Sequence, residues 1–157
     1  MEFTTDIFSL FDKDWALLTA GSPEKCNAMT ISWGGLGTLW GRPAATVYVR
    51  TSRYTHEFMD ANDYFTVSFY PEECRKALGI MGSRSGRDMD KAAAAGLHPV
   101  AAGPSASFAE AECTLVCRKL FMQPLDLARI PADIVQALYA KDAPHDMYIG
   151  EVVEIIR

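Results

Sequence analysis

The sequence lacks every feature of a membrane or secreted protein. No apolar run approaches the roughly 20 residues that a membrane-spanning helix needs. The first residues, MEFTTDIF, contain neither the basic segment nor the apolar stretch of a secretory signal. Four cysteines among 157 residues are too few for a disulfide scaffold and favour a reducing compartment. We therefore expect a cytoplasmic protein that does not bind membranes.

Common nucleotide and metal motifs are missing as well. There is no GxGxxG dinucleotide fingerprint and no Walker A phosphate loop. The cluster Gly34–Gly37 has another spacing and no helical pattern after it, so we interpret it as a flexible connection between strands. Cys113 and Cys117 lack the second Cys or His pair of a zinc site, and Cys26 and Cys74 are isolated. We expect core packing for all four cysteines and no metal.

The composition is that of a folded domain. At 49% hydrophobic and 22% charged residues, the chain can bury an ordinary core, and we expect one domain over residues 1–157. Short segments rich in β-branched or aromatic residues predict strands at Trp15–Ala20, Asn27–Trp33, Ala45–Arg50, Tyr64–Tyr70, Cys113–Leu120 and Met147–Ile156. Helical signals cover Thr55–Ala61 (with a Thr cap), Glu72–Leu78, Asp90–Ala95 and Pro131–Tyr139. Near-adjacent strands with few helices favour a mainly β fold, an antiparallel barrel or sandwich, over a doubly wound parallel sheet.

The charges are unevenly distributed. The net charge of −5 argues against a nucleic-acid partner. Acidic residues are nevertheless absent between Glu24 and Glu57 and again between Glu73 and Asp88, and each interval carries four cations. Two cationic stretches in an acidic protein suit a compact anion such as a phosphate. The alternative is that these side chains are solvated and unrelated.

Three segments carry candidate binding chemistry. Asn27–Trp33 alternates polar and apolar residues, and its small side chains would let a flat aromatic ligand approach the backbone. Arg50–Thr55 offers two guanidinium groups and three hydroxyls at a strand-to-helix junction, which suits a phosphate. Gly82–Asp88 combines glycines with Arg and Ser side chains and also favours an anion. Together they predict a phosphorylated aromatic cofactor.

The histidines identify no catalytic pair by themselves. His98 precedes a proline and is expected at the surface or in a cap. His56 and His145 stand out only by their neighbours, and a lone histidine is more often structural than functional. No Cys–His pair is indicated by spacing.

The three segments resemble the flavin reductase-like family of FMN-binding split barrels, which includes flavoredoxin-type proteins. The resemblance extends from Trp15 to Ile156. It rests on NAMTISW at 27–33, RTSRYTHE at 50–57, Tyr64–Tyr70 followed by Pro71, SGRDMDK at 85–91 and HDMYIGEVVEI at 145–155. One departure is that Ala92–Ala95 follow Lys91, where relatives often have an aromatic residue.

The resemblance implies a split β-barrel homodimer that holds FMN near the subunit interface. The flavin ring would face the Thr30 hydroxyl and the backbone amides of Met29, Thr30, Ile31 and Ser32. The phosphate would be held by Ser52, Arg53 and Thr55, assisted by Arg50. The site would be closed by Ser85, Gly86, Arg87 and Lys91. His145, the candidate catalytic residue, would lie beside the flavin or an incoming nicotinamide.

The implied function is that of an FMN-binding oxidoreductase, an NAD(P)H-dependent flavin reductase that transfers a hydride to the flavin. Hydride transfer needs no side-chain acid, in agreement with the missing catalytic pair. Two alternatives remain open. One is an FMN electron-transfer protein without NAD(P)H turnover, and the other is a non-enzymatic barrel that binds a different phosphorylated ligand or a protein partner.

Overall fold

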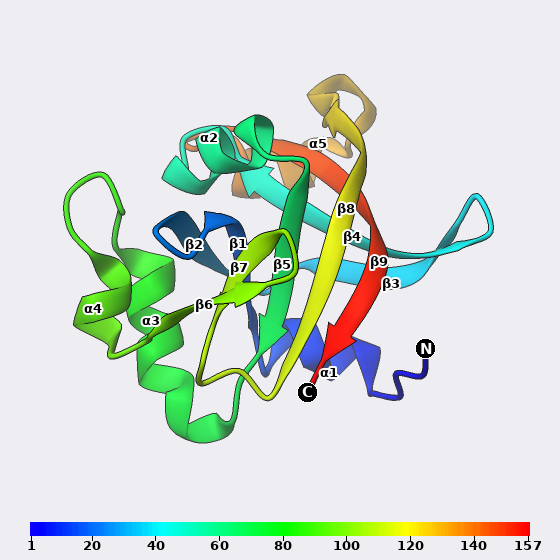
Figure 1. The fold of residues 1–157 in the computed structure, drawn as a ribbon. Coiled ribbons are helices and arrows are strands. Elements are labelled where there is room, and N and C mark those ends of the chain that lie inside the picture. Colours follow the sequence, from blue (N-terminus) through cyan, green and yellow to red (C-terminus); the bar gives the residue numbers. More distant parts are fainter.

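Seven strands form one antiparallel sheet in the order β2-β1-β5-β8-β9-β4-β3 (Figure 1). The computed structural model describes all residues, 1–157. The strands are β1 (Ala16–Ser22), β2 (Lys25–Ile31), β3 (Gly34–Leu39), β4 (Arg42–Arg50), β5 (Tyr64–Phe69), β8 (Cys113–Pro124) and β9 (His145–Ile156). A separate hairpin pairs β6 (Pro99–Ala102) with β7 (Ser105–Phe108). The expected mainly antiparallel β fold is confirmed, but the sheet does not close, because β2 and β3 remain at its two edges.

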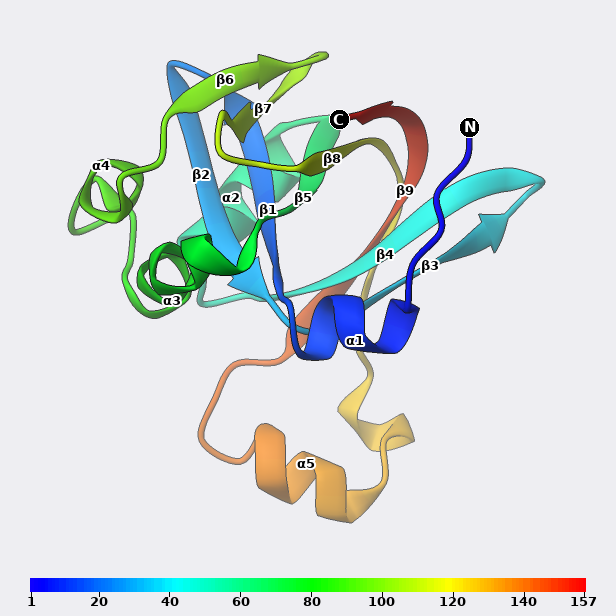
Figure 2. The ribbon, with the colours of Figure 1, turned by 90° about the horizontal axis from the view of Figure 1, so that it is seen from below.

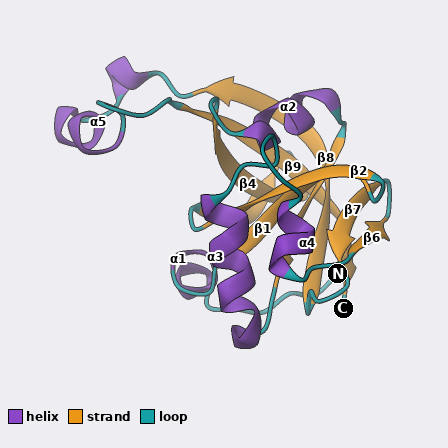
Figure 3. Cartoon of the chain, turned by 90° about the vertical axis from the view of Figure 1, so that its left-hand side faces the viewer, coloured by secondary structure: helices purple, strands orange, loops and turns teal.

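Five short helices surround the curved sheet. They are α1 (Ile7–Asp12), α2 (Tyr54–Ala61), α3 (Arg75–Ser83), α4 (Lys91–Ala95) and α5 (Ala132–Leu138). Single 3₁₀ turns at Glu72–Cys74 and Leu127–Arg129 precede α3 and α5. Figure 3 shows α3 and α4 side by side on one flank, while α5 stands away from the sheet, as it also does in Figure 2. None of the helices has the length and apolarity required to cross a membrane.

Strand β2 contributes side chains to two cores. Met29 and Ile31 belong to the main core inside the curved sheet, together with Phe65. Ala28 belongs to a second core, where Leu78 of α3 packs. This follows from the period of two along a strand, which sends alternate side chains to opposite faces. Both faces of β2 are therefore covered by protein.

The cluster Gly34–Gly37 is not the flexible connection that its composition predicts. It forms the first part of β3 and pairs with β4 over the register Gly34↔Val47 to Leu39↔Arg42. Backbone pairing requires no side chains, so the ladder overrides the flexibility of glycine. At Gly34 the packing requires a glycine, because a Cβ there would lie 2.8 Å from Cε1 of Phe11.

Local signals located most elements but missed some. Helix α1 was missed, although the Asp6 side chain caps it by accepting from the amides of Phe8 and Ser9. The β6–β7 hairpin was also missed. The expected Thr cap of α2 is wrong: the N-cap is Arg53 and makes no side-chain cap bond, while the Thr55 hydroxyl accepts from the Asn27 amide at 2.7 Å. The Thr55 hydroxyl is therefore engaged with a residue of β2 instead of an amide at the start of its own helix.

All four cysteines are free, and three of them pack against a core. Cys117 is fully buried in the main core, and Cys113 packs against it. Cys74 packs against the second core. Core packing is wrong for Cys26, which is half-buried and lines a cavity. The expectation for His98 is confirmed, since its side chain is 77% exposed and pairs with Glu110.

The packing around Gly150 gives a direct test of the fold. A Cβ at Gly150 would lie 2.6 Å from Cζ of Phe65 and 2.9 Å from Cβ of Cys117. We expect Gly150→Ala to lower the free energy of unfolding by about 1–3 kcal/mol through overpacking. Gly35→Ala is the matched control, because nothing lies within 4 Å of its added Cβ. Urea denaturation measures both, and equal effects of the two substitutions would contradict this account.

Candidate functional site

The unpaired edge of β2 organises the candidate site. β2 pairs with β1 alone, and in an antiparallel ladder the N–H and C=O of one residue point to the same side. The Ala28 carbonyl accepts from Lys91 Nζ at 2.6 Å, which places Ala28 at the free edge. The period of two then places the backbone groups of Cys26 and Thr30 at this edge also.

The expected contact with four successive amides must be corrected accordingly. Met29 and Ile31 lie opposite Leu18 and Ala16, and their backbone groups are used by β1. Along β2 only every second residue can offer a backbone N–H group to a ligand. Of the expected residues on this strand, Thr30 is the one whose amide remains free. Its side chain is also committed, since the Thr30 hydroxyl donates to the Leu78 carbonyl of α3. The hydroxyl proton thus anchors α3 instead of facing a ligand.

A cavity of about 160 Å³ lies at the Ile31 end of this edge. It lies between the end of β2, strand β4 and the start of β9. Its lining residues are Met29, Thr30, Ile31, Ser32, Trp33, Tyr48, Arg50, Arg53 and His145. We call it the ring cavity. Seven of the site residues expected from the sequence are brought together here, from three segments that are far apart in the chain.

Arg53 carries the feature that best fits an anion. Its Nη2 is buried and has no hydrogen-bond partner. Burial lowers the pKa of this guanidinium, and the charge of Arg50 lowers it further. Arg53 is also the N-cap of α2, and no side chain caps this helix start. An unpaired buried cation beside a helix N-terminus is a binding arrangement for a phosphate.

Arg50 is held by the segment that contains α5. Its Nη1 donates to the Ala143 carbonyl at 2.6 Å, and its guanidinium lies 5.3 Å from the centre of the Tyr139 ring. Asp142 lies at 3.9 Å from Nε. Arg50 therefore fixes this segment against β4 and contributes positive charge to the ring cavity, while its Nη1 donor is engaged elsewhere.

His145 lies directly opposite Arg50 in the β4–β9 ladder. It is 7% exposed, its Nδ1 is 2.7 Å from the Tyr139 hydroxyl, and its ring is 5.4 Å from that of Trp33. Burial, and then the charge of Arg50, lower the pKa of His145 to about 4, against a smaller opposing effect of Asp142. The imidazole is therefore neutral at pH 7.

The 85–91 segment connects α3 to α4 and lies against the start of α2. Gly86 allows a close approach, because a Cβ there would lie 2.1 Å from Oδ1 of Asn27. Arg87 donates to the Ser52 carbonyl at 3.2 Å and to Glu57 at 3.1 Å. These contacts place the segments 50–55 and 82–88 side by side.

Lys91 is a buried cation rather than a free one. It is 4% exposed, and its Nζ donates to Ala28 at 2.6 Å and to Met81 at 3.0 Å. Burial, and then the charge of Arg53, lower the pKa of Lys91 to about 8. Its ammonium ties β2 to α3 and places positive charge near Arg53.

The remaining expected residues lie outside the ring cavity. Thr55 is 1% exposed and holds Asn27. Ser52, Ser85 and Arg87 lie around the start of α2, and Gly86 and Lys91 line a neighbouring cavity. The two cationic stretches converge only in part. Arg42 pairs with Glu151 at 2.8 Å, and Arg75 stacks on Trp15, both outside the ring cavity.

Two aromatic residues of the site, Tyr48 and Tyr139, were not singled out from the sequence, and Trp33 was included only as the end of the segment Asn27–Trp33. Tyr48 lines the ring cavity two residues before Arg50, and this spacing on a strand was a usable signal. Trp33 stands after β2 and lies against His145. Tyr139 carried no such signal, since α5 meets β9 only in the folded chain.

No group of three or more His, Cys, Asp or Glu side chains is arranged to hold a metal ion.

Several solved structures are similar in fold to this chain. Flavoredoxin from Methanosarcina acetivorans is 21% identical with a TM-score of 0.71, covering 99% of this chain and 74% of that one. An FMN-binding protein from Thermus thermophilus, solved with bound 1-cyclohex-2-enone, is 18% identical with a TM-score of 0.73, covering 100% and 79%. Flavoredoxin of Desulfovibrio vulgaris (Miyazaki F) is 19% identical with a TM-score of 0.71, covering 99% and 76%.

These identities, all under 25%, show that the fold is shared. A search of curated proteins finds no match. Residues 8–157 match the family model described as flavin reductase like domain. The match covers nearly the whole chain, and the protein belongs to the flavin reductase-like domain family.

Proposed function

We propose that this flavin-related oxidoreductase, whose cofactor is FMN, takes its electrons as a hydride from NAD(P)H. The reductant is proposed from a similar structure, the NADH:FAD oxidoreductase of Streptomyces globisporus. The observation that carries the position of the cofactor is the unpartnered, buried Nη2 of Arg53 beside the uncapped start of α2. A buried donor without a partner costs free energy, and a phosphate oxygen at this point would remove that cost. Membership of the flavin reductase-like domain family supports FMN as the source of this phosphate.

The chain's residues divide the binding of FMN between two ends. Arg53 and the first amides of α2 would hold the phosphate, with Ser52 and Ser85 nearby. The free backbone groups at the Thr30 end of β2 would face the polar edge of the ring. N–H donors and the positive charge of Arg50 favour a ring that accepts electrons. When bound, FMN supplies the hydride chemistry itself.

His145 would act as a neutral group that positions the nicotinamide. Its Nδ1 is engaged with Tyr139, which leaves Nε2 for the ring cavity. Because burial keeps the imidazole neutral at pH 7, it adds no charge beside the flavin. A fixed neutral hydrogen-bonding group suits orientation for hydride transfer better than proton transfer, which this step does not need.

A second copy of the chain would complete the ring cavity. The cavity of about 160 Å³ is smaller than the roughly 300 Å³ at which small-molecule pockets begin. Next to it, α5 has no buried residue and exposes Ile134 and Leu138. These observations support a homodimer in which the partner covers the rest of the flavin. The four free thiols support placing this dimer in the cytoplasm.

The reductant is tested by mixing the FMN-loaded protein with NADH or NADPH in a stopped-flow instrument. We expect loss of the flavin's visible absorbance at a rate that saturates with the nicotinamide concentration. Free FMN at the same concentration is the control. Two of the similar structures are flavoredoxins, so bleaching by dithionite but by neither nicotinamide would favour the electron-transfer alternative.

Arg53→Ala tests the phosphate assignment. Removal of a charge-assisted hydrogen bond worth about 1.5–3 kcal/mol should weaken FMN binding roughly 10- to 150-fold. Flavin fluorescence quenching measures the dissociation constant. Arg53→Lys should fall between the two proteins, because it keeps the charge without the fork. Arg129→Ala, at an 86% exposed side chain, is the matched control. Undiminished FMN binding by Arg53→Ala would reject the assignment.

The neutral state of His145 predicts a pH dependence of stability. Its pKa is about 4 in the folded chain against an ordinary 6.5, so the unfolded chain takes up the proton first as the pH falls. The contribution of His145 to the free energy of unfolding should be constant above pH 6.5 and should fall towards pH 4, by up to about 3 kcal/mol. Urea denaturation of the protein and of His145→Gln should show a shallower loss for the variant. Parallel pH profiles would refute the assigned protonation state.

A further inference from the structure

Four polar side chains that line neither the ring cavity nor the cavity beside Cys26–Ala28 meet where α2 packs against β9. His56 Nε2 lies 2.6 Å from Asp146 Oδ2, and the Tyr148 hydroxyl donates to Asp60 Oδ1 at 2.6 Å. His56 Nδ1 lies 3.5 Å from Asp60 Oδ2. We call these four side chains, two from α2 and two from β9, the α2–β9 cluster.

The cluster is buried on the side of β9. Tyr148 and Asp146 are both buried. Burial, and then the hydrogen bond to Asp60, raise the pKa of Tyr148, so its hydroxyl stays protonated and is the donor. Asp146 lies opposite Val49 in the β4–β9 ladder, so its carboxylate is on the face of the main core. A carboxylate at such a place needs a hydrogen-bond donor, and His56 supplies it.

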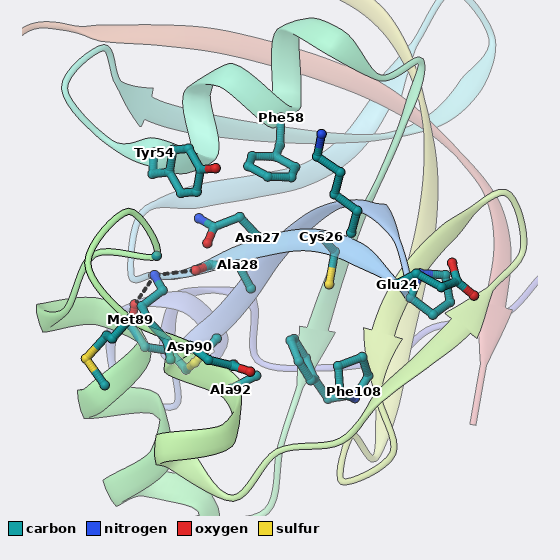
Figure 4. A pocket seen from close by; sticks show the side chains of 16 residues that line it. Glu24, Cys26, Asn27, Ala28, Tyr54, Phe58, Met89, Asp90, Ala92 and Phe108 are labelled. Atoms are coloured by element: carbon teal, nitrogen blue, oxygen red, sulfur yellow. Dashed lines mark hydrogen bonds between the residues drawn. The ribbon is translucent and has the colours of Figure 1, made fainter.

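Two faces of α2 have different partners. Residues four apart share a face of a helix, and an offset of two residues turns to roughly the opposite face. Tyr54 and Phe58 therefore form one face, and His56 and Asp60 form the other. Figure 4 shows Tyr54 and Phe58 with Asn27 of β2, around a cavity of about 320 Å³. The α2–β9 cluster thus occupies the side of α2 that is turned away from this cavity.

No other side-chain hydrogen bond joins α2 to β9. The Thr55 hydroxyl ties the start of α2 to Asn27 of β2. At the other end of the helix, Lys119 of β8 donates to the Met59 carbonyl at 2.6 Å. These contacts hold α2 to β2 and β8. Its placement relative to β9 depends on the α2–β9 cluster.

The cluster connects the two ends of the proposed FMN site. His56 lies one turn after Arg53, and its backbone amide donates to the Arg53 carbonyl at 3.0 Å. Asp146 follows His145, whose side chain points to the other face of β9 and lines the ring cavity. A continuous path of helix, hydrogen bond and strand therefore runs from the phosphate end of the site to its ring end.

We propose that His56 and Asp146 are positioning residues that set the distance between the start of α2 and the ring cavity. The inference rests on the proposed function, because it takes Arg53 and the start of α2 as the site of the FMN phosphate. Neither His56 nor Asp146 lines the ring cavity. Their effect is that one ligand reaches both ends of the site at once, which favours FMN over a flavin without a phosphate.

Riboflavin separates this role from a purely structural one, because it has the ring of FMN but no phosphate. We expect His56→Ala to lower the ratio of the riboflavin to the FMN dissociation constant roughly 10-fold or more, while riboflavin affinity stays unchanged. His56→Gln should keep most of this ratio, since its side-chain amide can donate to Asp146. Flavin fluorescence quenching measures both constants. His98→Ala removes an exposed His–carboxylate pair with Glu110 and is the matched control, with neither constant changed.

A second variant keeps the test independent of stability. His56→Ala leaves the Asp146 carboxylate buried without its donor, which destabilises the fold. The double substitution His56→Leu with Asp146→Leu avoids this cost, because apolar side chains can replace both members of a buried polar pair with little loss of stability. We expect this variant to unfold in urea near the midpoint of the unsubstituted protein. It should still lose the preference for FMN, since apolar contacts do not fix a direction.

The outcomes distinguish this inference from the proposed function. An unchanged preference for FMN in the double variant, or equal weakening of FMN and riboflavin binding in His56→Ala, would overturn the positioning role alone. An unsubstituted protein that binds riboflavin as tightly as FMN would refute the proposed phosphate site and the positioning role with it. No nicotinamide enters the titrations, so the identity of the reductant does not affect them.

Discussion

The unpaired edge of β2 is the constraint on which the site depends. Both faces of the strand are packed, with Met29 and Ile31 in one core and Ala28 in the other. The exposed polar groups of this strand are therefore those of its backbone edge, and these need partners. Lys91 satisfies the Ala28 carbonyl. The rest of the edge remains for a ligand, and a sheet that does not close is what keeps it available.

Burial of the two cations beside this edge, Arg53 and Lys91, costs the folded protein free energy. Lys91 and Arg53 are buried near one another, and burial lowers the pKa of both groups, as does the positive charge of a neighbour. Backbone carbonyls compensate Lys91, but Arg53 keeps an unpaired donor. An anion bound here would relieve both the repulsion and the missing hydrogen bond. Binding of a phosphorylated cofactor would then stabilise the fold, since such a ligand binds only the folded chain.

Hydrogen bonds to segments far away in the sequence fix the orientation of two further side chains of the ring cavity, those of Arg50 and His145. Arg50 is fixed by the Ala143 carbonyl, and His145 by the Tyr139 hydroxyl, so the segment that carries α5 orients both groups. Figure 3 shows α5 standing away from the sheet, and none of the residues of this helix is buried. The contacts of this segment with the site are the hydrogen bonds to Arg50 and His145 and the packing of the Tyr139 ring against both of these side chains. A second subunit that covers α5 would also fix the groups that this segment holds.

The sequence alone located six of the seven strands of the sheet, all but β3, and the polar chemistry of three segments, because hydrophobic alternation, turn residues and clustered cations are local properties. Period and capping located α4 between Asp90 and Gly96. Only the tertiary structure decided which edge of the sheet stays unpaired and that the glycines from Gly34 pair as a strand. It also decided that the hydroxyls of Thr30 and Thr55 form hydrogen bonds with other groups of the protein. Each of these depends on partners tens of residues away in the chain. A local sequence pattern can identify a candidate hydroxyl or guanidinium group. Whether that group remains free to bind a ligand depends on the other groups of the protein that contact it after folding.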